Sequence, residues 1–174
     1  TLVYVTETAP GCDVSSATTI TVTYTGTTAV DWDGSTSSDW FTASNWTPAC
    51  VPDAGIDVTI LNVGVNCDIQ FGNGGDANCK SITVNPSATL SLGDTKAVLN
   101  VHGNWTNNGT FAPTMGMVEF TGTAAQTISG AVTTFYDLNV NKGSGTATMS
   151  VDLNVASNLS LLDGELDINN NKIT

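Results

Sequence analysis

The chain has 174 residues, in which 16 acidic side chains face 4 lysines and no arginine, so the formal net charge is −12. Nucleic acids and anionic membrane surfaces are bound by clustered Lys and Arg, and this composition therefore excludes both as partners. No apolar run is long enough to span a bilayer, so membrane insertion is not expected. Ser, Thr, Asn, Asp and Gly fill most of the remaining sequence, which favours turns and strands over helices.

Residues 1–28 predict a short β-hairpin. Two runs of alternating polar and apolar residues, 2–7 and 18–24, flank a turn at Pro10-Gly11, a pattern typical of two antiparallel strands. A lone hairpin is marginally stable in water. The segment resembles the last two strands of an immunoglobulin-like module of bacterial surface proteins, which implies that the rest of that module lies upstream of this chain.

Residues 29–54 hold three of the four tryptophans in a distinctive motif. Its defining residues are Trp32, Gly34, Asp39, Trp40, Asn45 and Trp46, followed by Pro48, Pro52 and the run Asp57-Val58-Thr59-Ile60. The first rung of a stacked β fold exposes its core, and large aromatic side chains can cover it. We therefore expect Trp32, Trp40 and Trp46 to form an aromatic N-terminal cap.

This motif resembles the opening of repeat modules in large secreted proteins of the Bacteroidetes. Such proteins often leave the cell by the type IX secretion route and include gliding and adhesion proteins. The resemblance covers roughly residues 32–174. It implies an extracellular or outer cell-surface location and a structural or adhesive role.

Residues 55–174 carry many short strands and an internal repeat. The tripeptide Leu-Asn-Val occurs at residues 61–63, 99–101, 138–140 and 153–155. Short alternating strands with frequent turns are typical of a sandwich, a barrel or a solenoid, and the first three copies recur at near-equal intervals, which favours the solenoid. The sequence thus predicts an all-β chain with a parallel β-solenoid (β-helix) over residues 29–174. A β-sandwich is the alternative.

The apolar residues of the Leu-Asn-Val repeats should point into the core, because side chains alternate along a strand. We expect this of Leu99, Val101, Leu138, Val140, Leu153 and Val155, while Asn100, Asn139 and Asn154 should face out or bond along the stack. The pattern is still running at Thr174, so we interpret the solenoid as truncated at its C-terminal end. An uncovered last rung exposes strand edges. The expected partners are therefore other modules of the same long chain, or other copies of this one.

The four cysteines are Cys12, Cys50, Cys67 and Cys79, and none forms a C-x-x-C pair. The single histidine is His102, so a zinc site is not expected. An even number of cysteines in a Thr/Asn-rich chain favours two disulfides in an oxidising compartment. Three pairings are open, and the short spacing favours a bond between two of Cys50, Cys67 and Cys79.

Asp31, Asp33 and Asp76 are candidate calcium ligands. Asp31 and Asp33 stand as at the start of an EF-hand loop, but Thr42 occupies the position of the bidentate Glu. Asp76 ends a Gly-rich turn of a kind that binds calcium where it is repeated in tandem. The alternative is that these residues serve turn geometry. No other cofactor is expected.

No catalytic constellation is apparent, and we predict that the chain is not an enzyme. His102, the only candidate histidine base, lies in a turn where the related repeat has Ala156. The predicted role is a structural or adhesive module that forms an extended rod, stalk or filament. The alternative is a carbohydrate-binding module of a secreted multidomain hydrolase, with Trp40, Trp46 and Trp105 as an exposed aromatic platform. Solvent exposure of these tryptophans separates the two.

Overall fold

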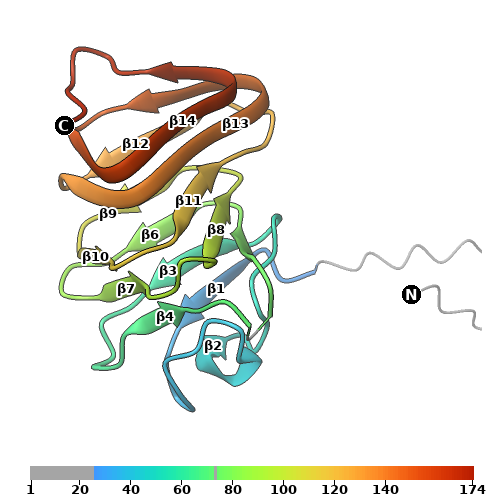
Figure 1. Cartoon of the computed structure of the whole chain (residues 1–174). Helices are drawn as coiled ribbons and strands as arrows, with labels where there is room; N and C mark the ends of the chain where they lie inside the picture. The colour runs from blue at the N-terminus through green and yellow to red at the C-terminus, as the bar shows by residue number, and fades with distance from the viewer. Residues whose placement is uncertain (1–25, 73) are drawn as a thin grey trace, which may run out of the picture.

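The strands of the chain wind into a three-sided solenoid (Figure 1). A computed structural model describes residues 26–72 and 74–174. The predicted parallel β-solenoid is confirmed, and the stacked strands make about five turns. In the described part of the chain the only helical segment is a single 3-10 turn, η1 (Ala43–Asn45). The predicted hairpin falls almost wholly on residues 1–25, outside the described residues.

The three faces of the solenoid are parallel stacks of short strands. The first face is built by β1 (Ala29–Trp32), β3 (Asp57–Ile60), β6 (Ile82–Val84), β9 (Trp105–Asn107) and β12 (Gln126–Gly130). The second face is built by β4 (Cys67–Ile69), β7 (Thr89–Leu92) and β10 (Thr110–Pro113). The third face is built by β5 (Ala77–Cys79), β8 (Val98–Val101) and β11 (Met117–Phe120).

Two long strands complete the stack at its C-terminal end. They are β13 (Thr133–Met149) and β14 (Leu153–Asp167). Each bends around the corners and so contributes a segment to more than one face, with β14 lying in parallel on β13. At the opposite end a two-residue strand, β2 (Trp46–Thr47), pairs with β1 in antiparallel orientation.

Pairing within each face keeps inward residues directly above one another. One inward column of the first face repeats at intervals of 24, 23 and 23 residues, through Val58, Ile82, Trp105 and Ile128. A rung is one full turn of this solenoid. Because each rung adds one strand spacing of about 4.8 Å, the stack grows along an axis perpendicular to the strands.

Two of the four Leu-Asn-Val copies confirm the inward–outward prediction. Leu99 and Leu138 lie in one column of the third face, two rungs apart, and both are buried together with Val101 and Val140. The intervening Asn side chains face outward and donate along the stack. Asn139 Nδ2, for example, donates to the Glu119 carboxylate of the preceding rung. The near-40-residue interval thus corresponds to two rungs.

The other two copies do not mark equivalent positions. Residues 61–63 follow β3 outside any strand, and Val63 is 40% exposed. Residues 153–155 begin β14 on the second face, above Thr133, with Leu153 buried and Val155 only partly so. An apolar–polar–apolar tripeptide fits any face of a solenoid, and the lengths of the corners decide which face it reaches.

The middle of the stack is filled by aromatic side chains from all three faces. The ring of Trp105, on the first face, lies 4.9 Å from Phe111, 6.5 Å from Phe120 and 5.2 Å from Phe135, measured between centroids. Trp105 is fully buried. These contacts tie the three faces to one continuous core.

Candidate functional site

A cap covers the N-terminal end of the solenoid, and the buried side chain of Asn45 organises it. The Asn45 Oδ1 accepts hydrogen bonds from the backbone N–H groups of Thr36 and Ser37, at 2.9 and 2.8 Å. Its Nδ2 donates to Ser37 Oγ at 2.9 Å and to the Asp39 carbonyl at 2.8 Å. One amide therefore holds residues 36–39 of the loop that precedes β2, although Asn45 itself has no exposed surface.

Three buried tryptophans fill the space between this loop and the first rung. The ring of Trp46 stands edge-on to Trp32 and to Trp40, at centroid distances of 5.1 and 4.8 Å. The indole N–H of Trp46 donates to the Trp40 carbonyl at 2.8 Å, and that of Trp32 donates to the Val65 carbonyl at 3.1 Å. Edge-to-face packing of this kind adds to the large apolar area that each ring buries.

Gly34 is required where the loop leaves β1. Its φ is +54°, a left-handed conformation that side chains disfavour. An added Cβ would also lie 3.0 Å from the Val65 Cβ and 3.1 Å from the Trp32 Nε1. Gly34, Asn45 and the three tryptophans are all residues of the motif, and each of them has a structural task in the cap.

The tryptophans do not form an exposed platform. Trp40 and Trp105 have no exposed surface and Trp46 is 1% exposed. A sugar ring can stack only on an accessible aromatic face. The aromatic platform that the sequence allowed for is therefore absent at these three residues, because they fill the cap and the core instead.

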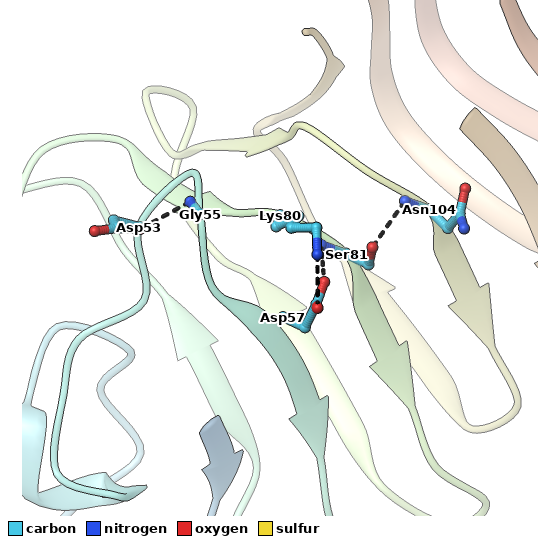
Figure 2. A network of polar contacts seen from close by, with 6 residues as sticks. All are labelled: Asp53, Gly55, Asp57, Lys80, Ser81 and Asn104. Atoms are coloured by element: carbon cyan, nitrogen blue, oxygen red, sulfur yellow. Dashed lines mark hydrogen bonds and ion pairs between the residues drawn. The ribbon is translucent and has the colours of Figure 1, made fainter. Parts of the chain in front are cut away.

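A ladder of side-chain-to-backbone hydrogen bonds joins successive rungs at the start of the first face (Figure 2). Asp57 Oδ1 accepts from the Ser81 N–H at 3.1 Å, and Ser81 Oγ accepts from the Asn104 N–H at 3.2 Å. Asn104 Oδ1 then accepts from the Thr127 N–H at 2.9 Å. Each link spans one rung, so this ladder fixes the register of four neighbouring strands.

Sequence analysis did not identify this ladder, although a signal was present. A short polar residue stands immediately before each inward residue of the column that contains Val58, Ile82, Trp105 and Ile128. The shared feature is a side-chain oxygen close to its own backbone, which suits bonding to a neighbouring N–H. The recurrence of such oxygens at intervals of 24, 23 and 23 residues could have been found only after the strand register was known.

Asp57 combines the ladder with an exposed ion pair. Its Oδ2 lies 3.0 Å from Lys80 Nζ, and both side chains are about half exposed. Partial burial alone raises the Asp57 pKa, but the hydrogen bonds from Lys80 and Ser81 outweigh it and lower the pKa below its usual value. Because the pair is solvated, its contribution to stability is small beside that of the buried cap.

A buried lysine closes the corner between the third and first faces. Lys142 has no exposed surface, and its Nζ donates to the Ala124 carbonyl at 2.9 Å and to Gln126 Oε1 at 2.6 Å. Gln126 Nε2 in turn donates to the carbonyls of Val101 and Gly103, at 2.8 and 2.7 Å. Desolvation lowers the Lys142 pKa. The network satisfies corner carbonyls of two rungs that would otherwise be buried unpaired.

Polar side chains also line the outer surface of the third face. Asn100 Nδ2 donates to Asn78 Oδ1 at 3.3 Å, and the same oxygen lies 3.5 Å from His102 Nε2. Partial burial lowers the His102 pKa, and the nearby Glu119 carboxylate opposes that shift. The Glu119 carboxylate itself accepts from Asn139 and Asn141. These hydrogen bonds link neighbouring rungs, and His102 takes part in them through its contact with Asn78 of the preceding rung.

The C-terminal end of the solenoid differs from the capped end. Its last full rung begins at Leu153 and lies at the top of the stack in Figure 1, farthest from β2. Residues 172–174 pair with Leu153–Val155 and so cover the first segment of that rung. Four of its aliphatic side chains are strongly exposed: Leu159 (40%), Leu161 (60%), Leu162 (62%) and Ile168 (48%). Val155, Leu166 and Ile173 are only partly buried against the core. The described part of the chain therefore leaves an apolar layer facing solvent.

The predicted disulfide among Cys50, Cys67 and Cys79 is not present. All three are free thiols. Cys67 lies in an inward column of the second face below Leu90, and Cys79 lies in one of the third face below Val101, so both act as small core residues. Burial raises the pKa of both thiols. Short spacing along the sequence did not bring the sulfurs together, because successive strands belong to different faces. Cys12 lies outside the described residues.

The calcium candidates are not gathered into one site. Within residues 26–72 and 74–174, no three His, Cys, Asp or Glu side chains form a group that could hold a metal ion. Asp31 and Asp76 are exposed. The Asp33 carboxylate accepts from Thr47 Oγ1 at 2.5 Å and from the Ser35 N–H at 2.9 Å, and these bonds lower its pKa. Asp33 therefore stabilises the turn of the cap.

Among the described residues, no helix has the length and apolarity that crossing a bilayer requires.

Part of the chain is similar to a family model that has no assigned activity. Residues 31–114 match a family model described as a domain of unknown function, DUF8693. The matched part begins within β1 and ends just after β10, so it contains the cap and the first rungs of the stack. No curated protein and no solved structure matches the chain.

Proposed function

We propose that the chain is a non-enzymatic structural and adhesive module of a bacterial surface or secreted protein, where it forms an extended, stiff rod. The observation that supports this is the continuous stack of parallel strands on one core. Backbone hydrogen bonds between rungs run along the axis of such a stack, and each rung contacts only its neighbours. A body built in this way gains length without gaining width, which suits a stalk, filament or adhesin arm.

The use of polar side chains supports a scaffold role. Asp57, Ser81 and Asn104 bond backbone groups of the next rung, and Lys142 bonds buried corner groups. These contacts stabilise register between strands. Polar residues on the walls of the solenoid therefore have structural tasks that do not depend on a substrate.

The cap supports a place among the large secreted proteins of the Bacteroidetes that use the type IX route. The proposal rests on the motif that begins at Trp32, and its key residues have defined tasks in the cap: Trp32, Gly34, Trp40, Asn45 and Trp46. A motif whose residues build the cap belongs to the architecture of the module. The alternative role in carbohydrate binding has less support, because the tryptophans that would carry it are buried.

Immunolabelling of intact cells of the source organism tests the location. Antibodies raised against the 174-residue chain should label unpermeabilised cells or detect the protein in the medium, while an antibody against a cytoplasmic enzyme labels only lysed cells. Labelling that requires lysis would overturn the surface assignment.

Tryptophan fluorescence tests the carbohydrate alternative. All four tryptophans are buried, so acrylamide should quench the native chain much less than the urea-unfolded chain. Soluble polysaccharides should leave the emission unchanged. A saturable shift with one polysaccharide would favour the carbohydrate-binding role over the scaffold role.

A further inference from the structure

Two polar side chains join three successive corners of the solenoid, between the third and first faces. Lys142 Nζ donates to the Ala124 carbonyl and to Gln126 Oε1, which belong to the corner one rung lower. Gln126 Nε2 then donates to the carbonyls of Val101 and Gly103, one rung lower again. The links pass from one side chain to the next, so together they connect three rungs.

Both linking side chains are enclosed by the protein. Lys142 has no exposed surface and Gln126 is 2% exposed. Gly164, in the last full rung, lies so close above Lys142 that an added Cβ would be 2.7 Å from the Lys142 Cβ. Among residues 26–72 and 74–174, Lys142 is the one charged side chain that is buried. Its ammonium group is therefore held by protein oxygens while the corner is closed.

Stability alone does not explain a buried lysine at this corner. Taking a charge out of water is costly, and well-packed apolar side chains often give equal or greater stability than buried charged groups. What the lysine adds is a set of short, directional links between rungs. Such links matter most while rungs are being separated, because the ammonium group must leave its acceptors before water reaches it.

Tension on the chain would separate the rungs in sequence. Each strand is bonded only to its neighbours in the stack, so a pull on the C-terminal side would remove β14 from β13, and then the end of β13 from β12. The backbone bonds of a strand that is peeled in this way break one after another. On this path, Lys142 is the first residue whose fully buried side chain is hydrogen-bonded to a lower rung.

We propose that Lys142 and Gln126 form a clamp that arrests unwinding of the solenoid from its C-terminal side. The clamp holds the cap and the rungs up to Lys142 together while the chain beyond it is extended. Its biological use rests on the proposed function, because an adhesive rod carries tension. The clamp itself rests on the contacts of Lys142, so force applied to the isolated chain tests it apart from any location on the cell.

Optical tweezers test the clamp on the 174-residue chain. One handle is attached at the C-terminus and the other at Asn108→Cys, an exposed corner position, in a background with Cys12→Ser and Cys50→Ser; the remaining thiols are buried, and the cap carries no load. We expect residues 143–174 to be released first, followed by a pause. The released segment has 174 − 142 = 32 residues. It adds a contour length of about 110 Å, at roughly 3.4 Å per extended residue.

A substitution of the lysine tests whether the clamp causes the pause. Lys142→Met removes the ammonium group and keeps an unbranched side chain. It should shorten the pause by about tenfold or more, the effect of losing one hydrogen bond to a charged group. Lys172→Met is the matched control, because it makes the same change at an exposed lysine within the released segment, and it should leave the pause unchanged. The urea midpoint of each variant shows whether it remains folded.

The native chain alone already puts the clamp at risk, since release without a pause at Lys142 would overturn the proposal whether or not a variant folds. A pause of equal lifetime in Lys142→Met would overturn it too, as would a pause that Lys172→Met shortens equally. None of these outcomes bears on the surface location, which immunolabelling tests separately.

Discussion

The two ends of the described solenoid differ in how far their core is covered. At the N-terminal end, Trp40 and Trp46 cover the first rung and the short antiparallel strand β2 occupies the edge of β1. At the C-terminal end, the last rung repeats the aliphatic pattern of the rungs below it and exposes Leu161 and Leu162. Both ends have the same stack beneath them.

This difference shows that a cap is more than a final repeat. The cap has its own hydrogen-bond centre at Asn45, its own aromatic packing and a change of strand direction, which prevents further parallel pairing on β1. The last rung has no comparable aromatic cluster among the described residues, and only its first segment is covered, by residues 172–174, which pair with Leu153–Val155. The two ends should therefore respond very differently to substitution.

The largest expected effect is at the aromatic cap. Trp46→Ala should lower the free energy of unfolding by about 3–5 kcal/mol, because it leaves a cavity between two other rings and removes a buried hydrogen bond. Leu161→Ala at the open end should cost less than about 1 kcal/mol, since that side chain is 60% exposed. Urea unfolding of both variants measures the two values. Equal losses would show that the ends are energetically alike.

The hydrogen-bond centre of the cap should come next. Asn45→Ala removes four hydrogen bonds and should cost about 2 kcal/mol, part of it from loop N–H groups that lose a fixed acceptor. Asn108→Ala, at an exposed residue between β9 and β10, is the control and should stay within about 0.5 kcal/mol. A cost for Asn45→Ala no larger than that of the control would mean that the tryptophans alone hold the cap.

Raising the pH should destabilise the capped half of the molecule. Cys67 and Cys79 lie in the first rung, and burial raises their pKa values, so the folded chain retains protons that the unfolded chain releases. Their contribution is fully present below the unfolded pKa of about 8.5 and is lost above it, at up to about 1.4 kcal/mol per pH unit for each thiol. Unfolding under reducing conditions between pH 7 and 10 measures this slope.

A matched substitution isolates the thiols from other titrating groups. Cys79→Ala should reduce the alkaline slope, while Cys50→Ala, at a partly exposed thiol, should leave it closer to that of the native chain. Slopes that are the same in both variants would contradict buried thiols as the cause.

The smallest expected effects lie in the ladder between the ends. Asn104→Ala removes the acceptor for the Thr127 N–H and should cost about 1 kcal/mol. Lys80→Ala breaks the exposed pair with Asp57 and should cost only a few tenths, about 0.3 kcal/mol, decreasing with salt. Urea unfolding at low and high salt distinguishes them. A larger, salt-dependent loss for Lys80→Ala would show that the ion pair, not the ladder, fixes the register.

The architecture could be predicted from the sequence because the alternation of inward and outward side chains along a strand is a local property. Leu99 and Val101 could be placed in the core from period two alone, and turn residues at regular intervals indicated a stack. The burial of the cap tryptophans followed from the need to cover a first rung. These inferences did not require knowledge of which strands are neighbours.

The features that were missed or wrong depend on register. The predicted disulfide was wrong because Cys67 and Cys79 enter the core from different faces. The first Leu-Asn-Val copy is not equivalent to the others because residues 61–63 fall at a corner, outside any strand. The contacts of Lys142 with Gln126 join residues 16 positions apart across a corner. Corner lengths set all of these relations, and they vary along the chain with no simple sequence rule.

The ladder that begins at Asp57 also means that the length of the solenoid can change only by whole rungs. Deletion of residues 82–104 would join Ser81 directly to Trp105, and Trp105 would take the place of Ile82 above Val58 in the same column. Ser81 would keep Asp57 as its acceptor, and the next corner would follow in register. Recombination between copies of such a unit can therefore lengthen or shorten the solenoid while the inward residues of the column remain stacked on one another. Its length changes in increments of one strand spacing, about 4.8 Å, and any other increment breaks the column.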